Sequence, residues 1–257
     1  RMKKILNYID GELIEPINGA YLDNFNPSTG KVYSLVPDSD HDDIDKAVKA
    51  AQIAYNEWSQ TSKEYRSEML LKLANILEKH TQEFIEAESK DNGKPETLAA
   101  KVDLPRALTN LRFFASAIKH DSSEMHDMDG EAINYTLRQP IGVAACISAW
   151  NLPIYLLTWK IAPALATGNT VVAKPSEITP MTAYLFSKIC IEAGLPKGVL
   201  NIVHGAGKKV GDPLTSHPDV PVVSFTGGTA TGKHISSITS PMFKKLSLEL
   251  GGKNPNI

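Results

Sequence analysis

The sequence predicts an α/β fold: a Rossmann-like parallel sheet of about five strands with helices on both faces, plus N-terminal helices and a β-arm. From residue 142 onward, short apolar runs alternate with segments whose apolar residues recur at helical spacing. That alternation is typical of strand–helix–strand units with parallel strands and two covered sheet faces. With 257 residues, 42% of them hydrophobic, the chain can also bury a sizeable core in one domain or two.

The first half is expected to contain short strands and then helices. Asp-Gly, Asn-Gly and Asn-Pro dipeptides punctuate residues 5–36, which predicts strands joined by turns. Ser39 or Asp40 is expected to cap the first helix. The expected helices begin near residue 42 and after Ser62, and cover 81–89 and about 95–120. The polar residues 121–130 end this region, and residues 132–138 read as a strand or hairpin arm.

The second half carries the regular alternation. Strands are expected over 142–148, 170–173, 199–203, 222–226 and 245–250, with helices over about 154–166, 179–193, 207–215 and 229–238.

Composition excludes several classes of function. The net charge of −2 gives no basic patch for nucleic acid or an anionic membrane surface. No apolar run reaches the roughly 20 residues of a spanning helix, and the N-terminus lacks the uninterrupted apolar core of a secretion signal. The two cysteines, Cys146 and Cys190, lie in apolar contexts, which favours reduced, buried thiols in a cytoplasmic protein.

Polar and glycine-rich sequence follows all five predicted strands. Ligands of an open parallel sheet bind at the carboxyl ends of its strands, so these segments are expected to share one edge. They are Ser148–Pro153, Lys174–Glu177, His204–Gly207, Thr226–Gly232 and Glu249–Gly252.

Each segment has a plain alternative. Gly227-Gly228 is either a tight turn or a helix start that offers free amides to a diphosphate. Lys174 and Glu177 are either a surface pair or ligands of ribose hydroxyls. Asn151 is either a helix cap or an amide donor to an oxyanion. Five such segments at one edge favour a dinucleotide site over five separate coincidences.

Glu249 suits a general base. It lies in the apolar run Leu246–Leu250, and apolar surroundings raise the proton affinity of a carboxylate toward neutral pH. The alternative is a glutamate on an edge strand that points into water.

The motifs SAWNLP, AKPSE, FTGGTATG and LELGGK resemble PWNFP, KPSE, FTGSTxxG and ELGGK of the NAD(P)-dependent aldehyde dehydrogenase superfamily. The resemblance covers the whole chain. Two positions depart from the pattern: Ala149 replaces the usual Pro, which loosens the turn before Asn151, and Gly228 replaces a Ser, which leaves its amide available.

The resemblance implies roles for matching positions. It makes Asn151 the oxyanion donor, Glu249 the base that activates water, and Lys160 part of a proton relay. It implies NAD as the cofactor, because the Glu177 carboxylate would repel the 2′-phosphate of NADP. NADP is nevertheless possible. No metal is implied. The cofactor residues it implies are Ser148, Trp150, Lys174, Ser176, Glu177, Gly207, Phe225, Thr226, Gly227, Gly228, Thr231, Leu250 and Gly251.

The resemblance also implies a domain plan. Residues 1–120 are the N-terminal part of the nucleotide-binding domain, 121–142 begin an oligomerisation arm of a homodimer or homotetramer, and 143–257 are the Rossmann-like core. The family's nucleophilic cysteine lies in a catalytic domain beyond residue 257, and this chain alone is expected not to oxidise aldehydes. The alternative is an NAD-binding module without catalysis.

Within the superfamily, VDLPRALTNLRFFA and WNLPIYLLTWKIAPAL are closest to muconic-type semialdehyde dehydrogenases. That likeness makes Arg106 a partner for a substrate carboxylate, and the alternative is an ordinary surface arginine. Betaine-aldehyde enzymes are the competing subgroup. Tyr155 and Trp159 could line a pocket for either substrate, but Arg106 would repel a quaternary ammonium.

Overall fold

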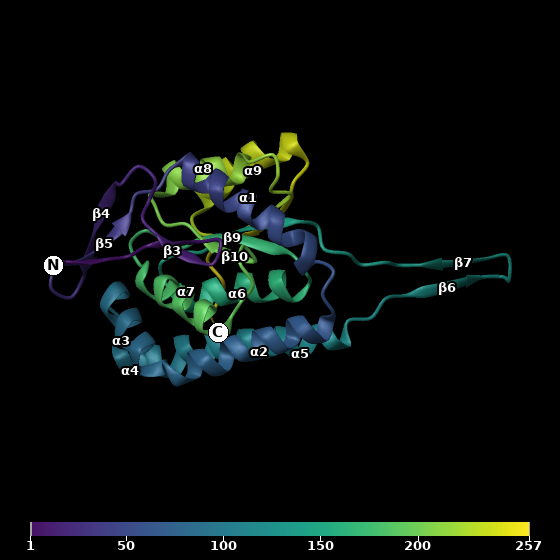
Figure 1. Cartoon of the computed structure of the whole chain (residues 1–257), viewed down its shortest axis with the longest axis horizontal. Coiled ribbons are helices and arrows are strands. Elements are labelled where there is room, and N and C mark those ends of the chain that lie inside the picture. Colours follow the sequence, from purple (N-terminus) through teal and green to yellow (C-terminus); the bar gives the residue numbers. More distant parts are fainter. Residues whose placement is uncertain (1, 257) are drawn as a thin grey trace.

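The computed structural model describes residues 2–256 and is built around a seven-stranded sheet (Figure 1). Its strand order is β12 (Lys245–Glu249), β11 (Val222–Thr226), β8 (Val143–Ile147), β9 (Thr170–Lys174), β10 (Leu200–Ile202), β2 (Asn7–Ile9) and β3 (Glu12–Ile14). The first five strands are parallel, as predicted, and β2 and β3 add antiparallel pairs at one edge. The sequence did not reveal this extension, because three-residue strands are too short for a periodic pattern.

The strand order reverses beside β8. From β8 the chain moves through β9 to β10 in one direction, and then continues on the other side of β8 with β11 and β12. A doubly wound sheet binds its ligand at this switch point, outside the carboxyl ends of the strands.

Helices cover both faces of the sheet, and its central strands β8, β9 and β10 bury every residue. In β8, Ala144 and Cys146 pack into one core, while Ala145 and Ile147 pack into another. The helices of the first core are α2 (Lys63–Lys79), α5 (Leu104–Ala117), α6 (Pro153–Ala166) and α7 (Met181–Ala193). Those of the second core, on the opposite face in Figure 1, are α1 (His41–Trp58), α8 (Gly207–Ser216) and α9 (Thr229–Thr239).

The predicted helix over 95–120 is helical but not uniform. It consists of α4 (Glu96–Leu98), a π-helical turn over Ala99–Asp103, α5, and a 3₁₀ turn over Ile118–His120. It follows α3 (Thr81–Asn92), which ends at Gly93 in a left-handed cap. Pro105 lacks the amide that an uninterrupted α-helix would use, and the π turn lies immediately before it.

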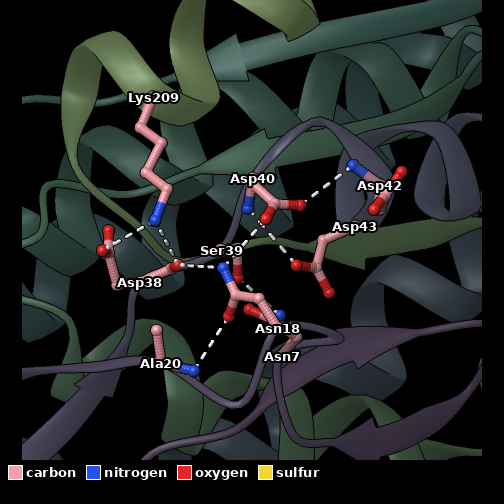
Figure 2. A network of polar contacts seen from close by, with 9 residues as sticks. All are labelled: Asn7, Asn18, Ala20, Asp38, Ser39, Asp40, Asp42, Asp43 and Lys209. Atoms are coloured by element: carbon pink, nitrogen blue, oxygen red, sulfur yellow. Dashed lines mark hydrogen bonds and ion pairs between the residues drawn. The ribbon is translucent and has the colours of Figure 1, made fainter.

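The N-terminus of α1 is tied to α8 by a polar network (Figure 2). Asp40 caps the helix, and the Asp43 side chain accepts in return from the backbone amide of Asp40, which completes a capping box. Asn18 donates to the Asp38 carbonyl at 3.0 Å and to Asp40 at 2.9 Å, and Lys209 of α8 pairs with the Asp38 carboxylate at 2.8 Å. The small sheet of β1 (Lys3–Lys4), β5 (Lys31–Pro37) and β4 (Tyr21–Asn26) precedes this network.

A two-stranded hairpin projects from the body of the protein (Figure 1). It pairs β6 (Met125–Met128) with β7 (Ala132–Tyr135) through the three-residue loop 129–131, in which Asp129 and Gly130 both have positive φ. The strand expected over 132–138 is confirmed in β7. The partner strand β6 lies in the segment that was read only as polar, because its apolar residues, Met125 and Met128, are too few to show a pattern.

Both cysteines are buried and free, as predicted. Burial raises the pKa of the Cys146 thiol to about 12 and also raises that of Cys190. Within residues 2–256, none of the helices has both the length and the apolar character that crossing a bilayer demands.

Candidate functional site

A cavity of about 860 Å³ lies at the carboxyl ends of the parallel strands, where the strand order reverses. All thirteen residues predicted to bind a cofactor line it, together with Asn151 and Glu249. They are Ser148, Trp150, Lys174, Ser176, Glu177, Gly207, Phe225, Thr226, Gly227, Gly228, Thr231, Leu250 and Gly251. The fold therefore brings together segments that are more than 100 residues apart in the sequence.

On the β9 side, the cavity holds a buried lysine paired with a carboxylate. Lys174 Nζ lies 3.0 Å from Glu177 Oε2, and its side chain is only 4% exposed. Glu177 Oε1 also accepts from the Gly207 amide at 3.3 Å. Burial raises the pKa of Glu177, but the charge of Lys174 and these hydrogen bonds outweigh it and leave the pKa below its ordinary value. Glu177 is therefore ionised at neutral pH and can accept from ligand hydroxyls.

Two helix N-termini open onto the same cavity. The cap residues of α8 and α9, Ala206 and Gly228, make no side-chain cap bond, although the first amide of α8 donates to Glu177. A Cβ at Gly228 would meet nothing within 4 Å, so its surroundings have room for a ligand. At Gly227, by contrast, a Cβ would lie 2.5 Å from the ring of Phe225, so glycine is needed for this close approach. The free amides suit a diphosphate.

Asn151 lies in the loop between β8 and α6. The helix-cap alternative for this residue is wrong, because Leu152 occupies the cap position of α6 and makes no side-chain cap bond. The Asn151 side chain is instead exposed and lines the cavity.

Glu249 ends the edge strand β12 and is exposed, so the apolar surroundings expected for it are not found. Side chains alternate along the strand: Leu246 and Leu248 turn toward the helix-covered core, while Ser247 and Glu249 do not. Thr226 Oγ1 donates to Glu249 Oε2 at 2.9 Å and orients the carboxylate.

Lys160 lies outside the main cavity. It lines a second cavity of about 600 Å³, which Glu249 also borders. Lys160 Nζ donates to Ser224 Oγ at 3.0 Å. Burial lowers the pKa of Lys160, and Cys146 and Glu249 partly offset this effect. The lowered pKa makes it easier for Lys160 to give up its proton than for an exposed lysine.

The three predicted substrate residues lie on neighbouring helices. Tyr155 and Trp159 of α6 have ring centroids 6.3 Å apart, and Trp159 lines the second cavity. Asn110 of α5 donates to the Tyr155 carbonyl at 3.1 Å, which joins the two helices. Arg106 is exposed on α5 and lines neither cavity.

Sequence reasoning assigned no cofactor role to eight further residues of the main cavity, although Ala149 and Ala230 lie in segments expected at this edge. They are Ile147, Ala149, Lys208, Gly211, Asp212, Ala230, His234 and Ile235. His234 of α9 lies 2.9 Å from Asp212 of α8, so this pair joins the two helices whose N-termini open onto the cavity. Helical spacing could have predicted three of these residues. Gly211 and Asp212 follow Gly207 by about one turn of α8, and His234 follows Thr231 by three residues on α9.

Comparison with known proteins is consistent with this geometry. The Aldehyde dehydrogenase family matches residues 14–257. The chain is 54% identical to a 2-aminomuconic semialdehyde dehydrogenase of Danio rerio, over 98% of this chain and 51% of the relative. It is 43% identical to a 2-hydroxymuconic semialdehyde dehydrogenase of Pseudomonas sp. (strain CF600), over 100% of this chain and 54% of the relative.

Among solved structures, the NAD⁺ complex of an aldehyde dehydrogenase from Bacillus cereus superposes with a TM-score of 0.97 at 38% identity, covering 99% of this chain and 52% of that one. The chain thus spans about half the length of the relatives it matches. The strand-end motifs, the doubly wound sheet and these matches together show that the chain belongs to the aldehyde dehydrogenase family.

Proposed function

We propose that the whole protein oxidises an aldehyde to the acid with NAD, and that this chain supplies the cofactor site and part of the catalytic machinery. The observation that carries the proposal is the main cavity. The cavity is lined by the Lys174–Glu177 pair, by the N-termini of two helices whose cap residues make no side-chain bond, and by Asn151 and Glu249.

The residues fit a dinucleotide. Glu177 would accept from ribose hydroxyls, and Lys174 would donate to them. The amides at the starts of α8 and α9 would hold the diphosphate. A negative Glu177 disfavours a 2′-phosphate, so NAD is preferred and NADP is bound more weakly. Bound NAD would supply the hydride acceptor.

Asn151 and Glu249 supply the remaining chemistry from this chain. The Asn151 amide donates to the substrate oxygen as negative charge develops during nucleophilic attack. Glu249 takes a proton from the water that hydrolyses the acyl intermediate, and Thr226 holds its carboxylate for this step. Lys160 lies on the other side of Glu249 and relays the proton onward.

The nucleophile is not one of this chain's cysteines. Cys146 and Cys190 are buried, their pKa values are raised, and neither lines the main cavity. We therefore expect the 257-residue chain to bind NAD without turning over an aldehyde. A protein that only binds NAD remains the second candidate, but binding alone requires neither Asn151 nor Glu249.

The substrate is a carboxylated semialdehyde of the muconic type. The named relatives support this assignment. Arg106 would pair with the substrate carboxylate, and Tyr155 and Trp159 would line the approach. The exposed hairpin of β6 and β7 would join copies into a homodimer or homotetramer in the cytoplasm, with residues 1–120 and 143–257 forming the nucleotide-binding domain.

Two experiments test the proposal. Calorimetric titration of this chain with NAD should give saturable binding, and absence of binding would overturn the cofactor assignment. In the full-length protein, a carboxylated semialdehyde should be turned over faster than betaine aldehyde. Arg106→Ala should reduce that preference. Arg112→Ala, also on α5, breaks an exposed pair with Glu78 of α2 and should leave the preference intact. Equal effects of the two variants would refute the role of Arg106.

A further inference from the structure

The loop that carries Asn151 is held from behind by donors outside the sheet. Asn92 Nδ2 donates to the carbonyl of Trp150 at 2.9 Å. Lys94 Nζ donates to the carbonyl of Asn151 at 3.1 Å. Asn92 is the last residue of α3 and Lys94 lies in the turn that follows. Between them, the left-handed Gly93 packs so closely on Pro27 that a Cβ there would lie 2.9 Å from its ring. The backbone of the loop is thus fixed while its side chains face the main cavity.

Lys94 is buried together with a carboxylate from the π-helical turn. Its side chain is 7% exposed and lies 2.9 Å from Asp103 Oδ2, which is fully buried. Asp103 is the last residue of the π turn before α5. Such turns often occur at functional sites, because they redirect side chains that a regular helix would place elsewhere.

A second buried carboxylate holds the other end of the loop. Glu88 of α3 is fully buried, and its Oε1 accepts from the Ile154 amide at 3.3 Å, in the first turn of α6. Burial and the charge of Asp103 raise the pKa of Glu88 to about 8. Glu88 is therefore mostly neutral at pH 7, and it forms a buried cluster with Lys94 and Asp103.

Stability alone is a weak explanation for this cluster. Burying an ion pair costs about as much desolvation energy as the attraction returns, and apolar residues of the same volume are often as stable. Here, one oxygen of Glu88 and one of Asp103 have no hydrogen-bond partner among residues 2–256, which adds to the cost. What distinguishes the cluster is its direct bonds to the backbone at Asn151 and at Ile154, where α6 begins.

We propose that Lys94 and Asp103 are positioning residues that orient Asn151 for its role at the oxyanion, with Glu88 fixing the start of α6. This inference rests on the proposed function, because it concerns the amide of Asn151. Lys94 fixes the Asn151 carbonyl, and the orientation of the backbone decides where the side-chain amide points. Asp103 accepts from Lys94 Nζ at 2.9 Å and so holds this donor in place. The Lys174–Glu177 pair lies elsewhere in the cavity and does not depend on this cluster.

A double-mutant cycle in the full-length protein tests the inference. Lys94→Met should lower kcat roughly 10- to 100-fold, as expected when a reacting group is misplaced by about 1 Å. It should leave the Kd for NAD, measured by calorimetry, unchanged. In an Asn151→Ala background, Lys94→Met should have little further effect on kcat, because the group that it positions is already absent. Lys119→Met, which breaks an exposed pair with Glu64, is the matched control and should change neither quantity.

The outcomes separate the two proposals. If Lys94→Met lowers kcat equally with and without Asn151, the positioning role is refuted and a structural role remains. If Asn151→Ala itself leaves kcat unchanged while NAD still binds, the proposed function of Asn151 fails instead. Should Lys94→Met not fold by circular dichroism, Asn92→Ala replaces it in the same cycle. That variant removes the Asn92 donor to the Trp150 carbonyl at 2.9 Å and to the Asn151 carbonyl at 3.5 Å, and an additive loss of kcat would again refute the inference.

Discussion

Removing the charge of Glu177 should weaken both NAD binding and the fold. In Glu177→Gln the amide keeps the shape of the side chain, but Lys174, only 4% exposed, loses its ionic partner 3.0 Å away. Breaking a fully buried pair costs about 3–5 kcal/mol. Because Glu177 is about one third exposed, solvent screening reduces this to about 1–2 kcal/mol.

That loss of unfolding free energy corresponds to a fall in Tm of about 2–8 °C for a domain of this size. NAD binding should weaken roughly fivefold, because a hydrogen bond to a charged acceptor is worth about 1 kcal/mol more than one to a neutral amide. The ratio of the Kd for NADP to that for NAD should fall, since the carboxylate no longer repels a 2′-phosphate.

Urea denaturation and calorimetric titration of this chain measure these quantities. Glu12→Gln is the matched control, because its pair with Lys197 is exposed and 3.9 Å long. Glu12→Gln should change the free energy of unfolding by less than about 0.5 kcal/mol and leave the Kd for NAD unchanged. If the two variants behave alike in both assays, the assignment of Lys174 and Glu177 to the cofactor site is refuted.

Four further predictions concern other parts of the chain. Gly227→Ala should unfold at lower urea than wild type, because its Cβ would lie 2.5 Å from the Phe225 ring, whereas Gly228→Ala, with open space around it, should not. The pKa of Glu88 is raised to about 8 in the folded state, so the unfolded state binds fewer protons than the folded state between about pH 4.5 and 8. The free energy of unfolding should therefore fall as the pH rises through that window. Glu88→Gln should make this fall smaller, as measured by urea denaturation at a series of pH values. Buried Cys146 and Cys190 should react with a thiol reagent only after unfolding, and rapid labelling of the folded chain would contradict their burial. Ile133→Glu on the exposed hairpin should shift the full-length protein toward monomer in analytical ultracentrifugation, while Asn134→Glu on the same strand should have less effect, because it removes no apolar surface.

The sequence alone determined the parallel core and its ligand edge. Apolar strands such as Val143–Ile147 and Thr170–Lys174 are buried on both faces, and this produces the continuous apolar runs visible in the sequence. Because parallel strands end at one edge, the polar segments after them had to meet there. This is why the Lys174–Glu177 pair and Gly227-Gly228 could be assigned to one site in advance.

Only the tertiary structure decided what those residues contact. The alternation of β12 leaves Glu249 exposed at the sheet edge, although its neighbours in the sequence are leucines. The structure also brings Lys94 and Asp103 to the loop of Asn151, which lies about 50 residues further along the chain. Such contacts depend on how helices pack on the sheet. The periodicity of apolar residues cannot predict that packing, because it indicates only which face of each helix or strand is apolar.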